Sequence, residues 1–341
     1  MTRYRPVAAL LLAGSLLSPS GANAQPKPPA SAALEGRAVT VSAGSASALV
    51  SSDLGEQFFD RCDTPTATQT LDWLEGNAGS ASPDFGIGVY ISGDFRGCPT
   101  QPNLTAQWVS DVTADGWAVL PIDVGPQVSC GNFNTEIPSN PALAYELGAQ
   151  EAANAVLAAA KLGIGSGVPI VSDLEGWTSG PIDTCTMEAE FYLQGWTDDL
   201  HAAGDLAGVY GSSFGTHLHE IWRGPSTTSV AGPGNIGPPP PDTPSQVHPD
   251  FVWAAEWPGS ATVWNLMYMP NSDWGSFDRR SRQFNANVSH TYGGVTMTVD
   301  DDCANGPFAR NNPADLETGE GGIGNTDAIS ETDDPSEDPY C

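Results

Sequence analysis

The chain has 341 residues, of which 41 are Asp or Glu and only 12 are Lys or Arg, so its formal net charge is −29. An acidic excess of this size repels phosphate groups, which excludes nucleic acids and anionic membrane surfaces as expected partners. Apolar residues make up 40% of the chain and include 10 Trp, which is enough for a packed core and excludes disorder throughout.

The first 24 residues have the pattern of a secretory signal peptide. Arg3 and Arg5 form a basic start, residues 7–17 are apolar, and residues 22–24 (ANA) resemble a small-residue cleavage site. The apolar stretch is too short to span a bilayer, and no later segment reaches about 18 apolar residues. We therefore expect a secreted or cell-envelope protein that does not insert into the membrane.

Three further segments have compositions that do not favour regular structure. Residues 25–52 are rich in Ala, Ser, Gly and Pro and are expected to form a flexible arm. Residues 224–249 contain a Pro- and Gly-rich run that predicts a long surface insertion. Residues 311–341 contain nine acids and no basic residue, which predicts a solvated acidic tail.

Between residues 53 and 310, apolar strands alternate with helices. Strands are expected at 57–60, 85–92, 117–124, 168–174, 206–210, 251–256, 282–285 and 295–299. The expected helix caps are Asn103, Asn140 and Thr186. This pattern predicts an α/β fold, a (β/α)8 TIM-like barrel with some helices missing in the C-terminal half. An open doubly wound sheet fits the same alternation, because strand order is not visible in the sequence.

Six cysteines without a CxxC pair indicate disulfides in an oxidising compartment, and do not indicate zinc binding or thiol redox chemistry. Six cysteines allow 15 connectivities. The barrel brings the loops after consecutive strands close together, which suggests particular neighbours. The expected disulfides are Cys62–Cys98, Cys130–Cys185 and Cys303–Cys341.

Acidic side chains gather where the expected strands end, and active sites of such barrels lie at the carboxyl ends of the strands. Asp173 and Glu175 in the segment VPIVSDLEGW are two residues apart, so they point to one side of their strand. Two close carboxylates do not ionise together easily, which raises the pKa of one of them. Such a pair suits glycoside hydrolysis, in which one acid protonates the leaving oxygen and its neighbour stabilises positive charge. The other acids at strand ends are Asp60, Asp123, Glu256 and residues 300–302.

Several segments together resemble a family of secreted, actinobacterial-type glycoside-hydrolase-like domains, which is similar to the glycoside hydrolase family 25 lysozymes. The segments are FFDRCDTPT, FGIGVYISG, NLTAQWVSDVTADGWAVLPIDVGPQ, GVPIVSDLEGW, LAGVYGSS, FVWAAEW and HTYGGVTMTVDDD, within residues 53–306. The sequence departs from the lysozymes in the three acids of its last strand and in the 224–249 insertion.

The resemblance implies roles for four catalytic acids. Glu175 would be the proton donor, and Asp173 would stabilise the oxocarbenium-like centre or orient a substrate N-acetyl group. Asp60 would line the same pocket, and Asp300 would be the acid that closes the last strand, with Asp302 as an alternative in the same phase. The residues expected to bind substrate are Tyr90, Asp123, Tyr210, Trp253, Glu256 and Trp257, with the aromatic rings as stacking faces for sugars.

Two other motifs compete with this interpretation. Residues 211–215 (GSSFG) fit a nucleophile elbow around Ser213, which His290 and either Asp250 or Asp273 would complete as a serine esterase. His217 and His219 are two residues apart on an expected helix and should point to different faces, which argues against a metal pair.

The leading hypothesis is therefore a monomeric, exported, muramidase-like glycosidase that acts on peptidoglycan or another extracellular polysaccharide. We expect it to need neither a cofactor nor a metal ion. The alternatives are a non-catalytic barrel that binds glycans or scaffolds the envelope, and a serine esterase that uses Ser213. Inverting, retaining and N-acetyl-assisted routes all stay open, because the separation of the carboxylates decides between them.

Overall fold

The computed structural model describes residues 49–131, 133, 136–177, 184–214, 217–223, 248–275, 279–311 and 341. Four expected features therefore lie wholly or mostly outside the described residues. They are the signal peptide (1–24), nearly all of the arm (25–52), the insertion (224–249, apart from its last two residues) and the acidic tail (311–341, apart from its two end residues).

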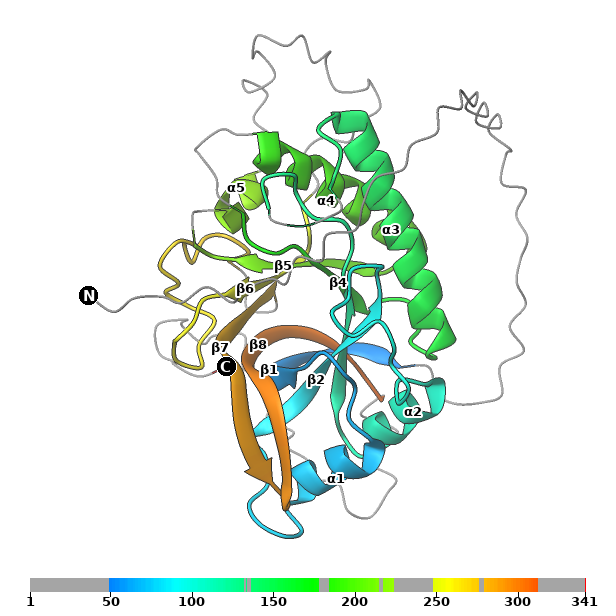
Figure 1. The fold of residues 1–341 in the computed structure, drawn as a ribbon, viewed down its shortest axis with the longest axis vertical. Coiled ribbons are helices and arrows are strands. Elements are labelled where there is room, and N and C mark those ends of the chain that lie inside the picture. Colours follow the sequence, from blue (N-terminus) through cyan, green and yellow to red (C-terminus); the bar gives the residue numbers. More distant parts are fainter. Residues whose placement is uncertain are drawn as a thin grey trace, which may run out of the picture. The chain divides into compact units, whose positions relative to one another are not determined.

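Eight strands close into a barrel in chain order (Figure 1). The strands are β1 (Val50–Asp60), β2 (Asp84–Ser92), β3 (Ala118–Asp123), β4 (Pro169–Asp173), β5 (Leu206–Ser212), β6 (Phe251–Ala255), β7 (Arg280–Tyr292) and β8 (Val295–Arg310). Closure excludes the open doubly wound sheet and confirms the predicted α/β barrel. Helices are missing between β6, β7 and β8 in the described residues, as predicted.

The last strand differs from the sequence prediction in length and direction. β7 and β8 form a long hairpin, and β8 is antiparallel to both β7 and β1, whereas β1 to β7 are parallel to their neighbours along the sheet. The reversal takes place at Gly293 and Gly294, both of which have positive φ. Asp300 therefore lies within β8 and not at its carboxyl end, and pairs with Asp60 at the end of β1.

Five helices accompany the strands: α1 (Ala67–Glu75), α2 (Ala106–Ala114), α3 (Pro141–Lys161), α4 (Thr184–Ala203) and α5 (His217–Arg223). The prediction of Asn140 as a cap with Pro141 in the first turn is confirmed. The prediction of Asn103 as a cap is wrong: Thr105 caps α2, and the Asn103 amide donates instead to the Thr64 carbonyl. α4 begins at Thr184, so Thr186 lies inside the helix and is not its cap.

Two glycines allow α3 and α4 to pack with their backbones close together. A Cβ atom on Gly148 would lie 1.9 Å from the Tyr192 carbonyl oxygen, and one on Gly195 would lie 2.0 Å from that of Tyr145. Any larger residue at either position would push the helices apart. The pair of helices lies against the barrel, with α4 mainly on β5 and α3 on β2 and β3.

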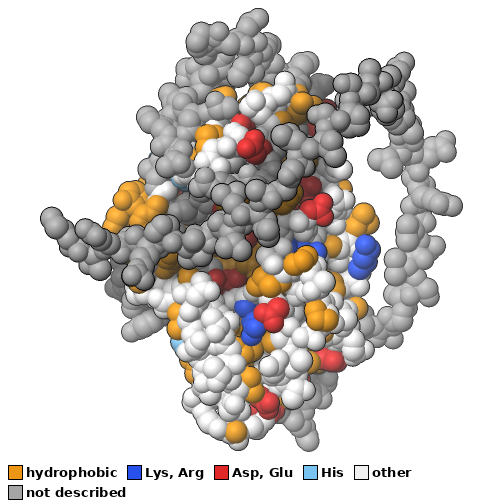
Figure 2. All heavy atoms as spheres, viewed as in Figure 1, with side chains coloured by type: hydrophobic (Ala, Val, Ile, Leu, Met, Phe, Trp, Pro, Cys, Tyr) orange, Lys and Arg blue, Asp and Glu red, His pale blue; other side chains and the backbone are white. Residues whose placement is uncertain are grey.

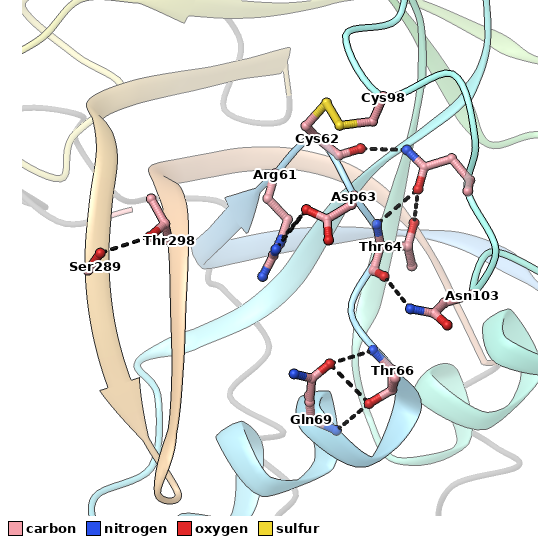
Figure 3. Close-up of polar contacts among 11 residues, drawn as sticks. Arg61, Cys62, Asp63, Thr64, Thr66, Gln69, Cys98, Asn103, Ser289 and Thr298 are labelled. Carbon is pink, nitrogen blue, oxygen red and sulfur yellow. Dashed lines mark hydrogen bonds and ion pairs between the residues drawn. A yellow bond between two sulfur atoms is a disulfide. The ribbon is translucent and has the colours of Figure 1, made fainter.

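Disulfides join the three expected cysteine pairs: Cys62–Cys98, Cys130–Cys185 and Cys303–Cys341. Figure 3 shows the first of them beside the connection from β1 to α1. There Thr66 and Gln69 form a capping box, in which the Thr66 hydroxyl accepts from the Gln69 amide and Gln69 Oε1 accepts from the Thr66 amide. The chain is thus fixed directly after Asp60.

Two separate apolar groups form most of the core. One group lies inside the barrel and includes Phe58, Leu120, Phe251 and Phe308. A larger group lies between the strands and the helices. Among the described residues, none of the helices is both long enough and apolar enough to span a membrane.

Candidate active site

Side chains from most of the strands converge at the carboxyl-end mouth of the barrel. Asp60 is the last residue of β1, Asp173 is the last residue of β4, and Glu175 follows two residues later. Because β8 runs in the opposite direction, Asp300 reaches the same place from the middle of its strand. We call Asp60, Asp173, Glu175 and Asp300 the carboxylate cluster; each of them interacts electrostatically with at least one other member.

Gln283 on β7 lies at the centre of the polar contacts on one side of this cluster. Its Nε2 donates to Asp60 Oδ2 at 3.0 Å and to Asp300 Oδ2 at 3.4 Å. Its Oε1 accepts from the Tyr210 hydroxyl and from Trp257 Nε1, both at 3.0 Å. One amide therefore links four of the residues that the sequence indicated, although Gln283 itself carried no motif.

Asp60 has a second donor on the neighbouring strand. The Tyr90 hydroxyl donates to Asp60 Oδ1 at 2.7 Å. Asp300 receives a hydrogen bond from the backbone amide of Asn287. Both contacts favour the ionised forms of these acids and so oppose the effect of burial.

A second glutamine fixes the loop that carries the Asp-x-Glu pair. Gln127, which is buried in the β3–α3 connection, accepts from the Glu175 backbone amide at 2.8 Å. Its Nε2 donates to the Asp173 carbonyl at 2.8 Å and to the Gly125 carbonyl at 3.1 Å. Gln127 belongs to the segment VGPQ, which had no assigned role in the sequence. It holds the main chain on both sides of the catalytic candidates.

The protein raises the pKa of each member of the carboxylate cluster. Burial, together with the neighbouring Asp300, raises the pKa of Asp60 to about 7. Burial raises the pKa of Asp173 well above its ordinary value, and the Glu175 and Asp60 charges add to this effect. Partial desolvation and the Asp300 charge raise the pKa of Glu175, whose side chain is exposed. The cluster can therefore hold protons at a pH at which ordinary carboxylates are ionised.

Trp253 and Asp302 form a buried pair inside the barrel. Trp253 Nε1 donates to Asp302 Oδ1 at 2.9 Å, and burial raises the pKa of Asp302 well above its ordinary value. Trp253 is only 1% exposed and its ring packs against Phe58 and Tyr210. The expectation that Trp253 offers a stacking face to sugars is therefore wrong, because strand alternation places its ring in the core.

Asp123 and Glu256 are the two acids among the predicted substrate-binding residues, and the Asp123 charge adds to the raised pKa of Asp173. Asp123 is fully buried, accepts from the Ser92 hydroxyl and faces α3 and α4, where Gly125 and Tyr192 are close to its Oδ2. Asp123 is thus buried on the side of the site that faces the helices, and its role in substrate binding stays a prediction. Glu256 lies at the rim, where it accepts from Ser213 Oγ at 2.7 Å and from the Met267 amide at 3.0 Å.

The structure does not assemble the predicted esterase triad. The Ser213 hydroxyl is bonded to Glu256, while His290 Nε2 lies 2.8 Å from Asp301 on the β7–β8 hairpin. Asp250 pairs with His201, and Asp273 pairs with His219. Each proposed partner of Ser213 is thus engaged elsewhere, so the hypothesis of a serine esterase is wrong.

His217 and His219 face different partners, as predicted. The His217 ring stacks on Trp177 with centroids 4.2 Å apart, whereas His219 Nδ1 lies 2.6 Å from Asp273 Oδ2. Within the described ranges, no group of three or more His, Cys, Asp or Glu residues is arranged to hold a metal ion.

An α/β barrel with carboxyl groups gathered at its mouth is an architecture typical of glycoside hydrolases. A family model agrees: residues 77–304 match the Rv2525c-like, glycoside hydrolase-like domain. The chain belongs to this family. No curated protein matches the chain.

Several solved structures are similar to the chain at low sequence identity. An uncharacterized protein of B. stearothermophilus is 17% identical, with 73% of this chain and 96% of that chain covered and a TM-score of 0.44. The Tat-secreted protein Rv2525c of Mycobacterium tuberculosis, in complex with L-tartrate, is 14% identical over 73% and 95% of the two chains, with a TM-score of 0.44. The glycosyl hydrolase 25 GHIP of Streptococcus pneumoniae is 13% identical over 77% and 90%, with a TM-score of 0.37.

Proposed function

We propose that this protein is an exported glycosidase that cleaves glycosidic bonds in peptidoglycan or a related extracellular polysaccharide. The observation that carries the proposal is the pairing of the exposed Glu175 with the buried Asp173 at the mouth of a glycoside hydrolase-like barrel, together with the raised pKa of each acid. Three disulfides are compatible with an oxidising destination outside the cytoplasm.

Glu175 is the proposed general acid. A general acid must be protonated before the reaction and must reach the leaving oxygen of the substrate. The raised pKa of Glu175 favours the first condition, and its exposure at the mouth favours the second. Gln127 holds the Glu175 amide and so limits the movement of the loop that presents this side chain.

Asp173 and Asp300 have complementary proposed roles. Asp173 is buried, and its strongly raised pKa favours a protonated carboxyl that can donate a hydrogen bond, for example to a substrate N-acetyl oxygen. Its Oδ1 has no protein partner among the described residues. Asp300 is less buried, and the Asn287 amide that donates to it lowers its pKa against the larger effect of burial; its proposed role is to stabilise an oxocarbenium-like centre as a carboxylate.

The test compares Glu175→Gln with Glu146→Gln, which changes an exposed glutamate on α3 away from the mouth. Purified proteins are incubated with peptidoglycan sacculi, and released reducing ends are measured. We expect Glu175→Gln to lower the rate by about 10²- to 10⁴-fold, the usual contribution of general acid catalysis. We expect Glu146→Gln to leave the rate unchanged, and both variants to keep the thermal unfolding midpoint of the unmodified chain.

Equal rates for Glu175→Gln and the unmodified protein would contradict the proposed role. A parallel sedimentation assay with sacculi addresses the non-catalytic alternative. Sedimentation of the unmodified protein with sacculi, without release of reducing ends, would favour a glycan-binding or scaffolding barrel over an enzyme.

A further inference from the structure

Four large apolar side chains are exposed together beyond the carboxyl ends of β5 and β6. They are Phe214 (45% exposed), Trp257 (47%), Met267 (71%) and Tyr268 (37%), which we call the aromatic ledge. The Phe214 and Tyr268 rings lie 5.5 Å apart between centroids. Figure 2 shows hydrophobic surface at the left of the view, on the side of the β6–β7 connection. Of the ledge residues, the sequence had indicated only Trp257.

Glu256 joins the two loops that carry the ledge. Its Oε2 accepts from the Ser213 hydroxyl, next to Phe214, and from the Met267 amide, next to Tyr268. The Arg282 guanidinium lies 3.6 Å from Glu256 Oε1 and also donates to the Glu256 carbonyl. A buried acid–base contact thus fixes the spacing of the exposed side chains.

The loop between β6 and β7 is also fixed from beneath. The fully buried Arg280 donates to the carbonyls of Val263, Pro270 and Asp273. Above it, the side chains of Asn265 and Asn271 bond to each other across the loop. A loop held at so many points presents Met267 and Tyr268 in a defined position, so a ligand that binds them has little ordering entropy to overcome.

The ledge is continuous with the carboxylate cluster. Trp257 Nε1 donates to Gln283 Oε1, and Gln283 Nε2 donates to Asp60. Phe214 and Trp257 each follow a parallel strand by two residues, as Glu175 does, so all three leave the barrel at the same end. A molecule that contacts both surfaces would therefore lie across the mouth.

The chemistry of the ledge favours a sugar ring over a charged ligand. Aromatic faces pack against the C–H faces of pyranose rings, and Tyr and Trp combine an apolar body with a polar tip. Glu256 joins the loops of the ledge, and within the described part of the chain Arg282 is the cation that pairs with it. The neighbouring carboxylate cluster would repel an anion.

We propose that the aromatic ledge is a glycan-binding subsite, on which an uncharged pyranose ring stacks while the next part of the same glycan enters the carboxylate cluster. The proposal rests on the proposed function for the identity of the ligand, and it adds that the ligand is an extended glycan. Phe214, Met267 and Tyr268 are then specificity-determining residues that do not take part in bond cleavage.

The test measures binding independently of turnover. Isothermal titration calorimetry with chitotetraose, and sedimentation with peptidoglycan sacculi, are performed on the full chain and on the double variant Phe214→Ala/Tyr268→Ala. We expect the double variant to bind chitotetraose about 10-fold more weakly, as expected for the loss of two aromatic contacts. Tyr268→Phe should bind like the unmodified protein, because it keeps the ring.

The matched control is Leu157→Ala, which removes an exposed apolar side chain (61% exposed) from α3 and should leave the affinity unchanged. Equal affinity of the double variant and the unmodified protein would overturn the proposal, as would the absence of binding to both probes. A change in oligomeric state of the double variant at unchanged affinity would instead indicate that a second copy of the chain covers the ledge. If Glu175→Gln releases no reducing ends but the double variant binds chitotetraose like the unmodified protein, only the glycan-binding role of the ledge is refuted. If the unmodified protein binds glycan without releasing reducing ends, only the proposed catalysis is refuted.

Discussion

The mouth of the barrel is fixed by two glutamines that act on different parts of the acids around them. Gln127 contacts the main chain of Asp173 and Glu175 and touches neither carboxyl group. Gln283 contacts the carboxyl groups of Asp60 and Asp300 directly. The first therefore fixes where the acids lie, whereas the second lowers the pKa of Asp60 against the larger effect of burial. Position and charge are thus supported by different glutamines on the two sides of one site.

The largest expected effect comes from Gln283→Leu. This change leaves a buried Asp60 oxygen, the Tyr210 hydroxyl and Trp257 Nε1 without their partner, which should lower the free energy of unfolding by about 2–4 kcal/mol. It should also shift the pH profile of activity. Urea unfolding and a pH–rate profile measure the two effects. Gln107→Leu, on the exposed surface of α2, is the control and should change the stability by less than about 0.5 kcal/mol.

A smaller loss is expected for Gln127→Met, which keeps the length of the side chain but removes its hydrogen bonds. The unpaired Glu175 amide and Asp173 carbonyl should cost about 1–3 kcal/mol of stability. The rate constant kcat should fall because the loop moves, while the pH profile keeps its shape because no carboxyl group loses a partner. A pH profile that shifts as much as that of Gln283→Leu would show that the two glutamines do not act separately.

Stability should also depend on pH in the direction set by the buried acids. Asp60 has a folded pKa of about 7, and unfolding returns it to its ordinary value near 4. Between these values the folded state binds more protons than the unfolded state, so stability falls as pH rises from about 4 to 7. The thermal unfolding midpoint should be higher at pH 5 than at pH 8. Asp60→Asn should flatten this slope; an unchanged slope would place the titrating group elsewhere.

The smallest expected effect tests whether the hydrogen bond from Tyr90 lowers the pKa of Asp60. Tyr90→Phe removes the hydroxyl that donates to Asp60, which should raise the pKa of Asp60 further and cost about 1 kcal/mol. Tyr210→Phe removes a donor to Gln283 and leaves the hydrogen bonds that Tyr90 and Gln283 donate to Asp60 in place. NMR titration of the Asp60 carboxyl distinguishes the two variants. Equal pKa values in both would show that Tyr90 does not set the charge of Asp60.

The sequence predicted the barrel because strand and helix periodicities are local signals. It also predicted Asp60, Asp173 and Glu175 at the mouth, because residues at the carboxyl end of a buried parallel strand lie there whatever the remaining fold. Two of the cysteine pairs, Cys62–Cys98 and Cys130–Cys185, followed from the same reasoning, since loops after adjacent strands are neighbours. These predictions needed only the order of elements and the direction of the chain within each.

The two glutamines could not be recognised in this way. Each acts through contacts distant in sequence: 48 residues separate Gln127 from Glu175, and 223 separate Gln283 from Asp60. A single buried amide has no spacing pattern of its own. The segment VGPQ took part in the family resemblance, but nothing in it showed what the glutamine bonds to.

By itself, the sequence determined an acidic, cysteine-paired α/β barrel with carboxyl groups at its strand ends, because composition, periodicity and strand direction are properties of short stretches of chain. Only the tertiary structure decided that β8 runs backwards to bring Asp300 beside Asp60, and that Trp253 is buried while Trp257 is exposed. It also decided which acids are desolvated enough to hold protons. The reason is physical: burial, pairing and pKa depend on what the rest of the chain places around a residue.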